Sequence, residues 1–424
     1  MILRSRRVVA PGGVRAATIH VDGERIVRLG DYDEPHDIDH GDLVIMPGLV
    51  DSHVHVNEPG RTEWEGFETA TRAAAAGGVT TIVDMPLNSI PPTNSVRALR
   101  IKAEAMQGKC WVDVGLWGGA VPDNASQLKP MLREGALGFK CFLVDSGVPE
   151  FGFLDPFMLE AALHELRDTN APLLVHAELP QFIGSADGAS YRAYLQSRPP
   201  EAEDAAIDLV CSAVKRTGGR AHIVHLSSAA GLDLIARAGV TAETTPHYLH
   251  FEAEKIPDGA PQFKCAPPIR EHANREKLWK RIDEFAGIVS DHSPCTPELK
   301  HLQDGDIEKA WGGIASLQFG LPVIWSSGRL TLERIVKLMC EGPAAIAGIE
   351  KGSLRPGFDA DLVVWSPEES FRVGPEIVQH RHKVTPYAGE ELRGVVKTTY
   401  LRGRKVWQDG STIGSPNGKW IRKS

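Results

Sequence analysis

Residues 43–56, LVIMPGLVDSHVHV, join an apolar run to two histidines separated by a single residue. Strands that are apolar on both faces are typical of a parallel sheet covered by helices on both sides. The run therefore predicts a buried parallel strand over 43–50. Polar side chains able to bind a cation follow at its carboxyl end.

The same pattern recurs along the chain, in alternation with helix-like segments. Seven further strands are expected at 79–84, 111–117, 137–143, 172–177, 221–226, 240–245 and 287–291, and helices at 64–76, 156–168, 203–216, 229–238 and 271–285. Eight strands alternating with helices over roughly 250 residues predict an α/β fold, a (β/α)8 barrel of the TIM type. A doubly wound α/β sheet is the alternative, but no GxGxxG follows the first strand to support dinucleotide binding.

The two ends of the chain differ from its centre. Residues 1–42 and 351–410 both contain short β-like runs separated by Asp and Gly. Neither segment has enough apolar surface to form a stable fold by itself. We expect them to pack together as a small β-sandwich domain formed by residues 1–47 and 350–424. Residues 48–349 then form the barrel.

Composition excludes several classes of protein. The chain has 424 residues, 42% of them hydrophobic, which is typical of a globular protein and not of a disordered one. Its net charge of −8 gives no support for a nucleic-acid partner, and long uncharged apolar runs that would span a membrane are missing. Six cysteines without a CxxC pair argue against disulfides or a thiolate zinc site and predict a cytoplasmic setting.

Side chains that can bind metals lie at the ends of the predicted strands or, in the case of Lys140, within one. They are His53, His55, Lys140, His176, His225 and Asp291. In a parallel barrel these strand ends open onto one face, where barrel enzymes place their catalytic groups. Four imidazoles and a carboxylate exceed what one tetrahedral catalytic site needs, so two divalent cations are expected. Zinc is the first choice, with manganese, cobalt or iron as alternatives. The competing interpretation of each histidine is a surface or structural role.

Lys140 and Asp291 suggest how such a site works. Lys140 lies in the apolar stretch GFKCF, where burial lowers the pKa of an amine. A neutral amine reacts with carbon dioxide to give a carbamate, a carboxylate that can bridge two cations; a Schiff-base lysine or a structural lysine are the alternatives. Asp291 is expected to bind a cation, to act as general base, or both, and a helix-capping role is its alternative.

Several motifs together resemble one family. PGLVDSHVHV, GGVTTIVDMPLN, GFKCF, LLVHAE, HIVHLSS, TPHY and VSDHSP occur in order over residues 47–350. They resemble the cyclic amidohydrolases of the amidohydrolase superfamily, and the resemblance covers nearly the whole chain. Within that group the stretches CAPPIR, DHSPC and KAWGGIASLQ look most like the allantoinases.

This resemblance implies a metal arrangement and a reaction. It assigns His53, His55 and Asp291 to one cation, His176 and His225 to the second, and a carboxylated Lys140 as the bridge. Metal-bound hydroxide would open the hydantoin ring amide of allantoin to allantoate, a step of purine catabolism. Asp291 would pass the proton to the leaving nitrogen. Family members are often homotetramers, so a homo-oligomer is expected.

The substrate expectation depends on departures from the patterns of related families. Dihydroorotases typically carry an arginine where this chain has Asn57, and hydantoinases or dihydropyrimidinases usually have a tyrosine soon after the bridging lysine, where this chain reads FLVDSG. Both remain alternative activities. We expect Asn57, Asn88 and Ser293 to line a neutral substrate pocket.

Other residues and protein classes stay open. Arg61 and Trp64 are further candidates for the substrate pocket, whereas His247 is left outside the metal set. A metal-free lysine enzyme, such as an aldolase, and a non-catalytic assembly protein are the competing classes. The strand-end histidines argue against the first, and the six retained ligand positions argue against the second.

Overall fold

The parallel strands follow one another in chain order in the computed structural model, which describes residues 1–186 and 188–422. They are β6 (Leu49–Val54), β7 (Val79–Asp84), β8 (Asp113–Leu116), β9 (Gly118–Gly119), β10 (Phe139–Phe142), β11 (Leu173–His176), β12 (Ala221–Ile223), β13 (Thr241–Thr244) and β14 (Gly287–Ile288). Strands β6 to β8 pair in parallel, as do β9 to β14, and only Trp117 separates β8 from β9. A parallel bridge between Val54 and His292 links the end of this series back to β6.

One predicted strand is wrong in its extent. The run expected at 43–50 is divided at Gly48: β5 (Val44–Pro47) joins the sheet of the chain ends, and β6 starts the parallel series. A Cβ atom at Gly48 would lie 2.2 Å from Oγ1 of Thr80, so only glycine allows this close approach. His53 consequently lies inside a strand and not after one. The other seven predicted strands are present; β7 has the predicted bounds and the other six are shorter.

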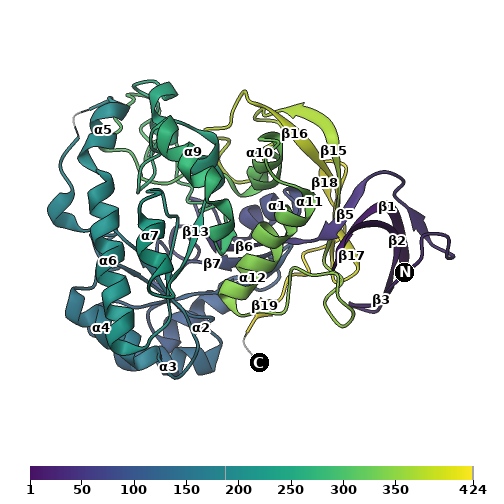
Figure 1. Ribbon diagram of the computed structural model, residues 1–424, viewed down its shortest axis with the longest axis horizontal. Coiled ribbons are helices and arrows are strands. Elements are labelled where there is room, and N and C mark those ends of the chain that lie inside the picture. Colours follow the sequence, from purple (N-terminus) through teal and green to yellow (C-terminus); the bar gives the residue numbers. More distant parts are fainter. Residues whose placement is uncertain (187, 423–424) are drawn as a thin grey trace.

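Helices occupy the expected connections. The α-helices are α1 (Phe67–Ala76), α2 (Val96–Ala105), α3 (Ala125–Glu134), α4 (Pro156–Leu166), α5 (Tyr191–Ser197), α6 (Pro200–Thr217), α7 (Gly231–Ala236), α8 (Pro246–His250), α9 (His272–Lys280), α10 (Gly320–Ser326), α11 (Leu332–Val336) and α12 (Gly342–Ala347), with a π-helical turn, η6, at Lys337–Glu341. Figure 1 shows α3, α4 and α6 as neighbours on the outer side of the strands. The predicted helix over 271–285 ends early, at Lys280, and a short 3-10 turn follows it.

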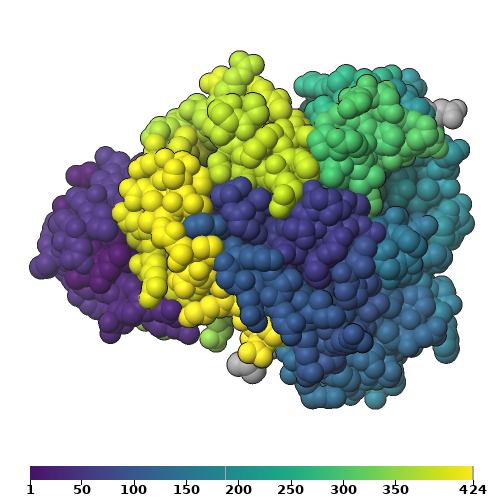
Figure 2. Space-filling model, turned by 180° about the vertical axis from the view of Figure 1, so that it is seen from behind, coloured from purple at the N-terminus to yellow at the C-terminus, as the bar shows by residue number. Residues whose placement is uncertain are grey.

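The two chain ends share one nine-stranded sheet. It consists of β1 (Ile2–Ala10), β2 (Gly13–Asp22), β3 (Arg25–Gly30), β4 (Ile38–Asp39) and β5 from the amino end, and β15 (Leu362–Arg372), β16 (Glu391–Leu401), β17 (Arg404–Gln408) and β18 (Ser411–Thr412) from the carboxyl end. Strand β15 pairs with β5 in antiparallel register, which joins the two segments. Figure 2 shows the two segments in contact, in purple and yellow. Strands from the two chain ends therefore lie in one sheet, whereas the composite domain of residues 1–47 and 350–424 and its sandwich arrangement stay predictions.

A buried charge cluster ties this sheet to the parallel strands. Nζ of Lys351 lies 2.7 Å from Oδ2 of Asp113 in β8 and 2.7 Å from Oδ2 of Asp361, just before β15. Arg402, after β16, also pairs with Asp113. Since each charge has an opposite partner, the cluster satisfies groups that would otherwise be costly to bury.

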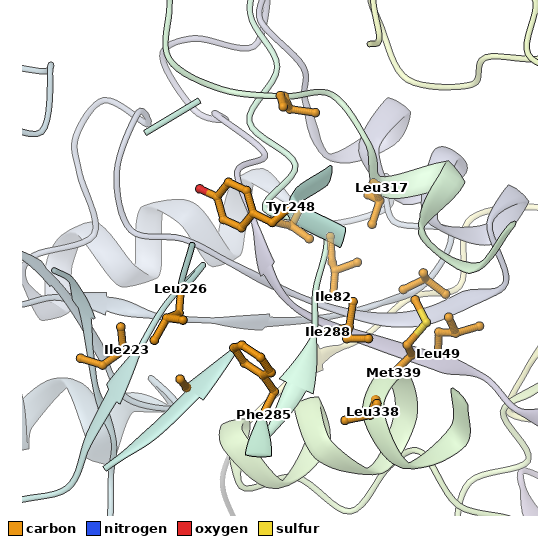
Figure 3. Packing of buried hydrophobic residues seen from close by; sticks show 14 of the residues in the cluster. Leu49, Ile82, Ile223, Leu226, Tyr248, Phe285, Ile288, Leu317, Leu338 and Met339 are labelled. Carbon is orange, nitrogen blue, oxygen red and sulfur yellow. The ribbon is translucent and has the colours of Figure 1, made fainter. Parts of the chain in front are cut away.

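Apolar side chains pack beneath the parallel strands. Figure 3 shows Leu49, Ile82 and Ile288, from β6, β7 and β14, beside Leu338 and Met339 of the π-helical turn η6. Each of these side chains is at most 4% exposed, and burying one stabilises the fold by roughly 1.5–3 kcal/mol. This core holds the strand ends in fixed positions. Among the described residues, the helices are all too short or too polar to cross a membrane.

Candidate metal centre

One cavity of about 580 Å³ opens at the carboxyl ends of the parallel strands. All of the predicted metal ligands line it: His53, His55, Lys140, His176, His225 and Asp291. They come from five different strands or the segments directly after them, so the tertiary fold brings together residues up to 238 positions apart. The volume is in the range of small-molecule sites.

His53, His55 and Asp291 form the first part of the cluster. Oδ1 of Asp291 lies 3.1 Å from Nε2 of His53 and 3.6 Å from Nε2 of His55. The side chains are nearly inaccessible to solvent. Burial by itself raises the pKa of Asp291, but the neighbouring imidazoles outweigh it and hold that pKa well below its usual range. The carboxylate is therefore ionised, as a metal ligand must be.

His176 and His225 complete the imidazole set. Nδ1 of His176 lies 3.1 Å from Nε2 of His225, and burial lowers the pKa of both rings. Their neutral forms have free lone pairs, which a cation requires. His225 also belongs to a trio with His53 and Asp291 whose ligand atoms lie within 4.8 Å of one another. The trio includes residues from both predicted ligand sets, as expected where two cations lie about 3.5–4 Å apart.

Two buried imidazole nitrogens lack hydrogen-bond partners within the described part of the chain, as expected of atoms that bind a cation. Among the residues that the structure describes, Nε2 of His53 and Nδ1 of His225 have no hydrogen-bond partner. A buried polar atom without a partner costs free energy, and a metal ion would satisfy both atoms. Imidazole nitrogens with a carboxylate oxygen are donors that suit zinc and related divalent cations. The residues present therefore fit the expected metals.

Lys140 sits in the middle of strand β10 and is 1% exposed. Its Nζ lies 5.0 Å from the centroid of the Phe142 ring. Burial lowers the pKa of Lys140 to about 8, although the carboxylates of Asp291 and Glu243 act in the opposite direction. A substantial neutral fraction is thus available at neutral to mildly basic pH, which is the form that reacts with carbon dioxide.

Several site residues adopt a left-handed backbone conformation. The φ angles are 67° for Asn57, 65° for Asn88, 39° for His225 and 46° for Asp291. Residues other than glycine adopt this backbone conformation rarely, at a cost of roughly 1–3 kcal/mol each. Such strain concentrates at functional sites because it aims side chains in directions that an ordinary strand end cannot.

Two carboxylates that the sequence analysis missed orient the histidines. Oε1 of Glu243, in β13, lies 2.6 Å from Nδ1 of His53, and its Oε2 lies 3.1 Å from Nε2 of His222. Burial alone raises the pKa of Glu243, but the bonds from His222 and His53 lower it to about 2. A charged residue inside the strand TAET was the available signal, because a carboxylate buried within a strand needs a partner.

Glu178 plays the equivalent part for His176. Its Oε2 lies 2.7 Å from Nε2 of His176, and Arg198 donates to both of its oxygens. Burial raises the pKa of Glu178, yet Arg198 and His176 outweigh this and bring it to about 2. The signal in the sequence was the HAE stretch at 176–178, in which the glutamate follows the histidine by two residues.

The predicted substrate contacts are only partly in place. Asn88 and Ser293 line the cavity, but Asn57 does not. The Asn57 amide donates to the Pro294 carbonyl at 3.2 Å and accepts from Nδ2 of Asn88 at 3.0 Å. A direct contact between Asn57 and substrate therefore has no support, because its amide instead connects the loops that carry Asn88 and Ser293.

An aromatic wall forms one side of the cavity. The rings of Trp64 and Trp311 meet edge to face, with centroids 4.8 Å apart, and the Arg61 guanidinium lies 5.1 Å from the centroid of the Trp64 ring. Trp311 donates to Oγ of Ser293 at 3.4 Å. His247, by contrast, is buried outside the cavity lining. Trp64 and Arg61 thus gain support as pocket residues, and His247 stays outside the metal set.

Comparisons with known proteins identify the family. The profile of the amidohydrolase family matches residues 44–406. An allantoinase of Streptomyces avermitilis is 46% identical, over 100% of this chain and 98% of its own. Allantoinases of Arabidopsis thaliana and Saccharomyces cerevisiae are 44% and 46% identical, over 96% and 90% of this chain and 88% and 86% of their own.

Solved structures agree at the level of the fold. An L-hydantoinase (dihydropyrimidinase) from Arthrobacter aurescens superimposes with a TM-score of 0.92 at 29% identity, over 100% of this chain and 99% of its own. A dihydropyrimidinase from Brevibacillus agri gives 0.89 at 26% identity, over 100% and 99% of the two chains. The overall architecture of this chain is thus shared with enzymes named for cyclic amide substrates.

Proposed function

Because the chain belongs to the amidohydrolase family, we propose that it hydrolyses the hydantoin ring amide of allantoin and releases allantoate. One observation carries the proposal: four imidazoles, an amine and a carboxylate converge in one cavity of a chain that is 46% identical to a named allantoinase. The reaction class follows from the cluster, and the substrate follows from the relatives.

The proposed site holds two divalent cations, with zinc as the first choice. His53, His55 and Asp291 would hold one, and His176 and His225 the other. Lys140, as a carbamate formed from its neutral amine and carbon dioxide with release of a proton, would bridge them. When bound, such cations lower the pKa of water to about 7 and polarise a carbonyl.

Asp291 is proposed as the residue that moves the proton. Its Oδ1 faces His53 and His55, and its Oδ2, which makes no hydrogen bond within the described part of the chain, would accept a proton from the attacking water. The water oxygen forms a bond to the ring carbonyl carbon, the ring C–N bond breaks, and Asp291 returns the proton to the leaving nitrogen. The net reaction adds one water and makes a carboxylate and an amide nitrogen.

We further propose that the parallel strands close into a (β/α)8 barrel of residues 48–349. The bridge between Val54 and His292 supports closure. The buried cluster that includes Leu3, Ile19, Ile45 and Leu362 supports a terminal domain, of residues 1–47 and 350–424, that curls over its own core. Residues 423 and 424 of that domain lie outside the described chain. A homotetramer and a cytoplasmic location remain predictions.

The test is a ring-opening assay on purified protein of known metal content. Allantoin, dihydroorotate, dihydrouracil and hydantoin are compared side by side, and we expect allantoin to have the highest kcat/KM, with about two metals per chain. Turnover of dihydroorotate in preference to allantoin would contradict the proposal. A hydantoinase activity is the second candidate, favoured by the superposition on the Arthrobacter enzyme.

A further inference from the structure

Arg198 stands in the cavity on a rigid support. It follows α5 and precedes the two prolines that lead into α6, which restricts its own backbone. Arg270 donates to the Arg198 carbonyl oxygen at 3.2 Å. The Arg198 side chain lines the cavity with 18% of its surface exposed. Its position is therefore fixed before any ligand binds.

The guanidinium group is only partly used within the protein. Nε donates to Oε1 of Glu178 at 3.1 Å, and Nη2 donates to Oε2 at 2.9 Å. Over residues 1–186 and 188–422, the third nitrogen, Nη1, makes no hydrogen bond. Glu178 also accepts a hydrogen bond from Nε2 of His176. The guanidinium is thus linked to a proposed metal ligand through two hydrogen bonds that share the Glu178 carboxylate. A group attached to the reacting ring would lie within its reach.

The charge of this arginine is already balanced. Glu178 is fully buried and accepts two hydrogen bonds from the guanidinium, so the two side chains form a buried ion pair. The other arginine of the cavity, Arg61, is paired with Glu150 through a single nitrogen, Nη1. A guanidinium paired like this offers directed N–H groups without a net charge. It suits a neutral carbonyl oxygen better than a free carboxylate, which would gain little from a pair that is already neutral.

We infer that Arg198 is a specificity residue that donates from Nη1 to the carbonyl oxygen of the ureido arm of the substrate. This inference rests on the proposed function and adds how allantoin is told apart from rings that lack the arm. The arm is planar and neutral, and it carries one acceptor oxygen, which matches a single N–H donor held in place. Arg198 takes no part in bond breaking.

The experiment compares two ligands that differ only in the arm, allantoin and hydantoin. For Arg198→Met, we expect kcat/KM for allantoin to fall by about 10- to 100-fold, mainly through KM, as for loss of one charge-assisted hydrogen bond. Affinity for hydantoin is measured as KM or as Ki against allantoin. It should change by less than about threefold, because hydantoin has no arm for Arg198 to contact. Arg100→Met is the matched control, since Arg100 makes the same two-bond pair with Glu134 on the exposed surface.

A second variant separates the loss of the Arg198 donor from the effect of leaving the Glu178 carboxylate buried without its partner. In the double variant Arg198→Met/Glu178→Gln, positions 178 and 198 carry no buried charge. The glutamine oxygen can still accept a hydrogen bond from His176. Metal content and unfolding temperature are measured for each variant. The same selective loss in the double variant supports the inference. Equal losses for allantoin and hydantoin, or unchanged selectivity, would overturn it, whereas failure of the wild-type protein to open allantoin would overturn the proposed function itself.

Discussion

Oε1 of Glu243 lies 2.6 Å from Nδ1 of His53, although 190 positions separate the two residues in the chain. Because the ionised carboxylate accepts a hydrogen bond from Nδ1–H, Nε2 is the nitrogen of His53 that is left to bind a cation, and it faces Asp291. The tautomer and the ring orientation of a proposed metal ligand are thus set by a residue from another strand.

Glu243→Gln should weaken metal binding without unfolding the protein. Loss of such a supporting carboxylate typically costs about 10- to 100-fold in metal affinity. Competition with a chelator of known affinity measures the change. Glu134→Gln, an exposed carboxylate paired with Arg100, is the control and should bind metal like the wild type. Unchanged metal affinity in Glu243→Gln would show that His53 is oriented by other means.

Lys140→Met should lose both turnover and part of the bound metal. Methionine keeps a similar volume in the apolar surroundings but cannot form a carbamate. Wild-type protein supplied with ¹³C-labelled bicarbonate should give a carbamate resonance in the NMR spectrum, and the variant should not. Near-normal turnover of the variant at full metal content would remove Lys140 from the mechanism.

Asp291→Asn keeps an oxygen at the metal position but cannot accept a proton. We expect kcat to fall by about 10²- to 10⁴-fold, the usual contribution of a general base. Metal content, measured on the same sample, should fall far less. If kcat and metal content decline together in proportion, Asp291 acts only as a ligand.

Removal of the metals should lower stability as well as activity. A ligand that binds only the folded state at a free concentration 100 times its Kd contributes about 2.7 kcal/mol. Chelated protein should therefore unfold at a lower temperature in calorimetry. Zinc with bicarbonate should restore activity more completely than zinc alone, because the carbamate must re-form. The sample without bicarbonate is kept in buffer free of carbon dioxide. Equal recovery of activity in the two samples would contradict the bridging role of Lys140.

Lys351→Met should destabilise the protein by about 3–5 kcal/mol near neutral pH, since it leaves Asp113 and Asp361 buried without their shared partner. Burial raises the pKa of Asp113, but Lys351 and Arg402 outweigh it and lower that pKa below 3.8. Asp113 therefore adds stability to the wild type above pH 3.8, and this contribution is lost as the pH falls further. The gap between variant and wild type in denaturant unfolding should narrow below that pH. A gap independent of pH would mean that lost packing, and not charge, causes the effect.

The sequence predicted the parts of this protein that depend on local pattern. Apolar runs located the parallel strands because a strand buried on both faces must be apolar throughout. Residues at the ends of those runs could be placed on one face, since parallel strands share a direction. His53, His55, His176, His225 and Asp291 were predicted in this way, and Lys140 was predicted from its place inside such a run; all six line the cavity.

Partners across the fold could not be predicted in the same way. The run at 43–50 gave no sign that it divides between two sheets at Gly48, and the close approach of Thr80, which leaves no room for a side chain there, comes from another strand. Asn57 was expected to face substrate, but its amide is used between loops. The pairing of Glu178 with Arg198 depends on how the segment after β11 meets the link between α5 and α6.

The sequence by itself therefore determined which chemical groups the protein has and at which strand ends they lie. Periodicity and residue type act over a few neighbouring positions and need no knowledge of the fold. Only the tertiary structure decided which nitrogen of each histidine is free, which charges are already paired, and which polar groups reach the cavity. Those properties depend on distances of about 3 Å between residues far apart in the chain, and hydrogen bonds act only at such short range.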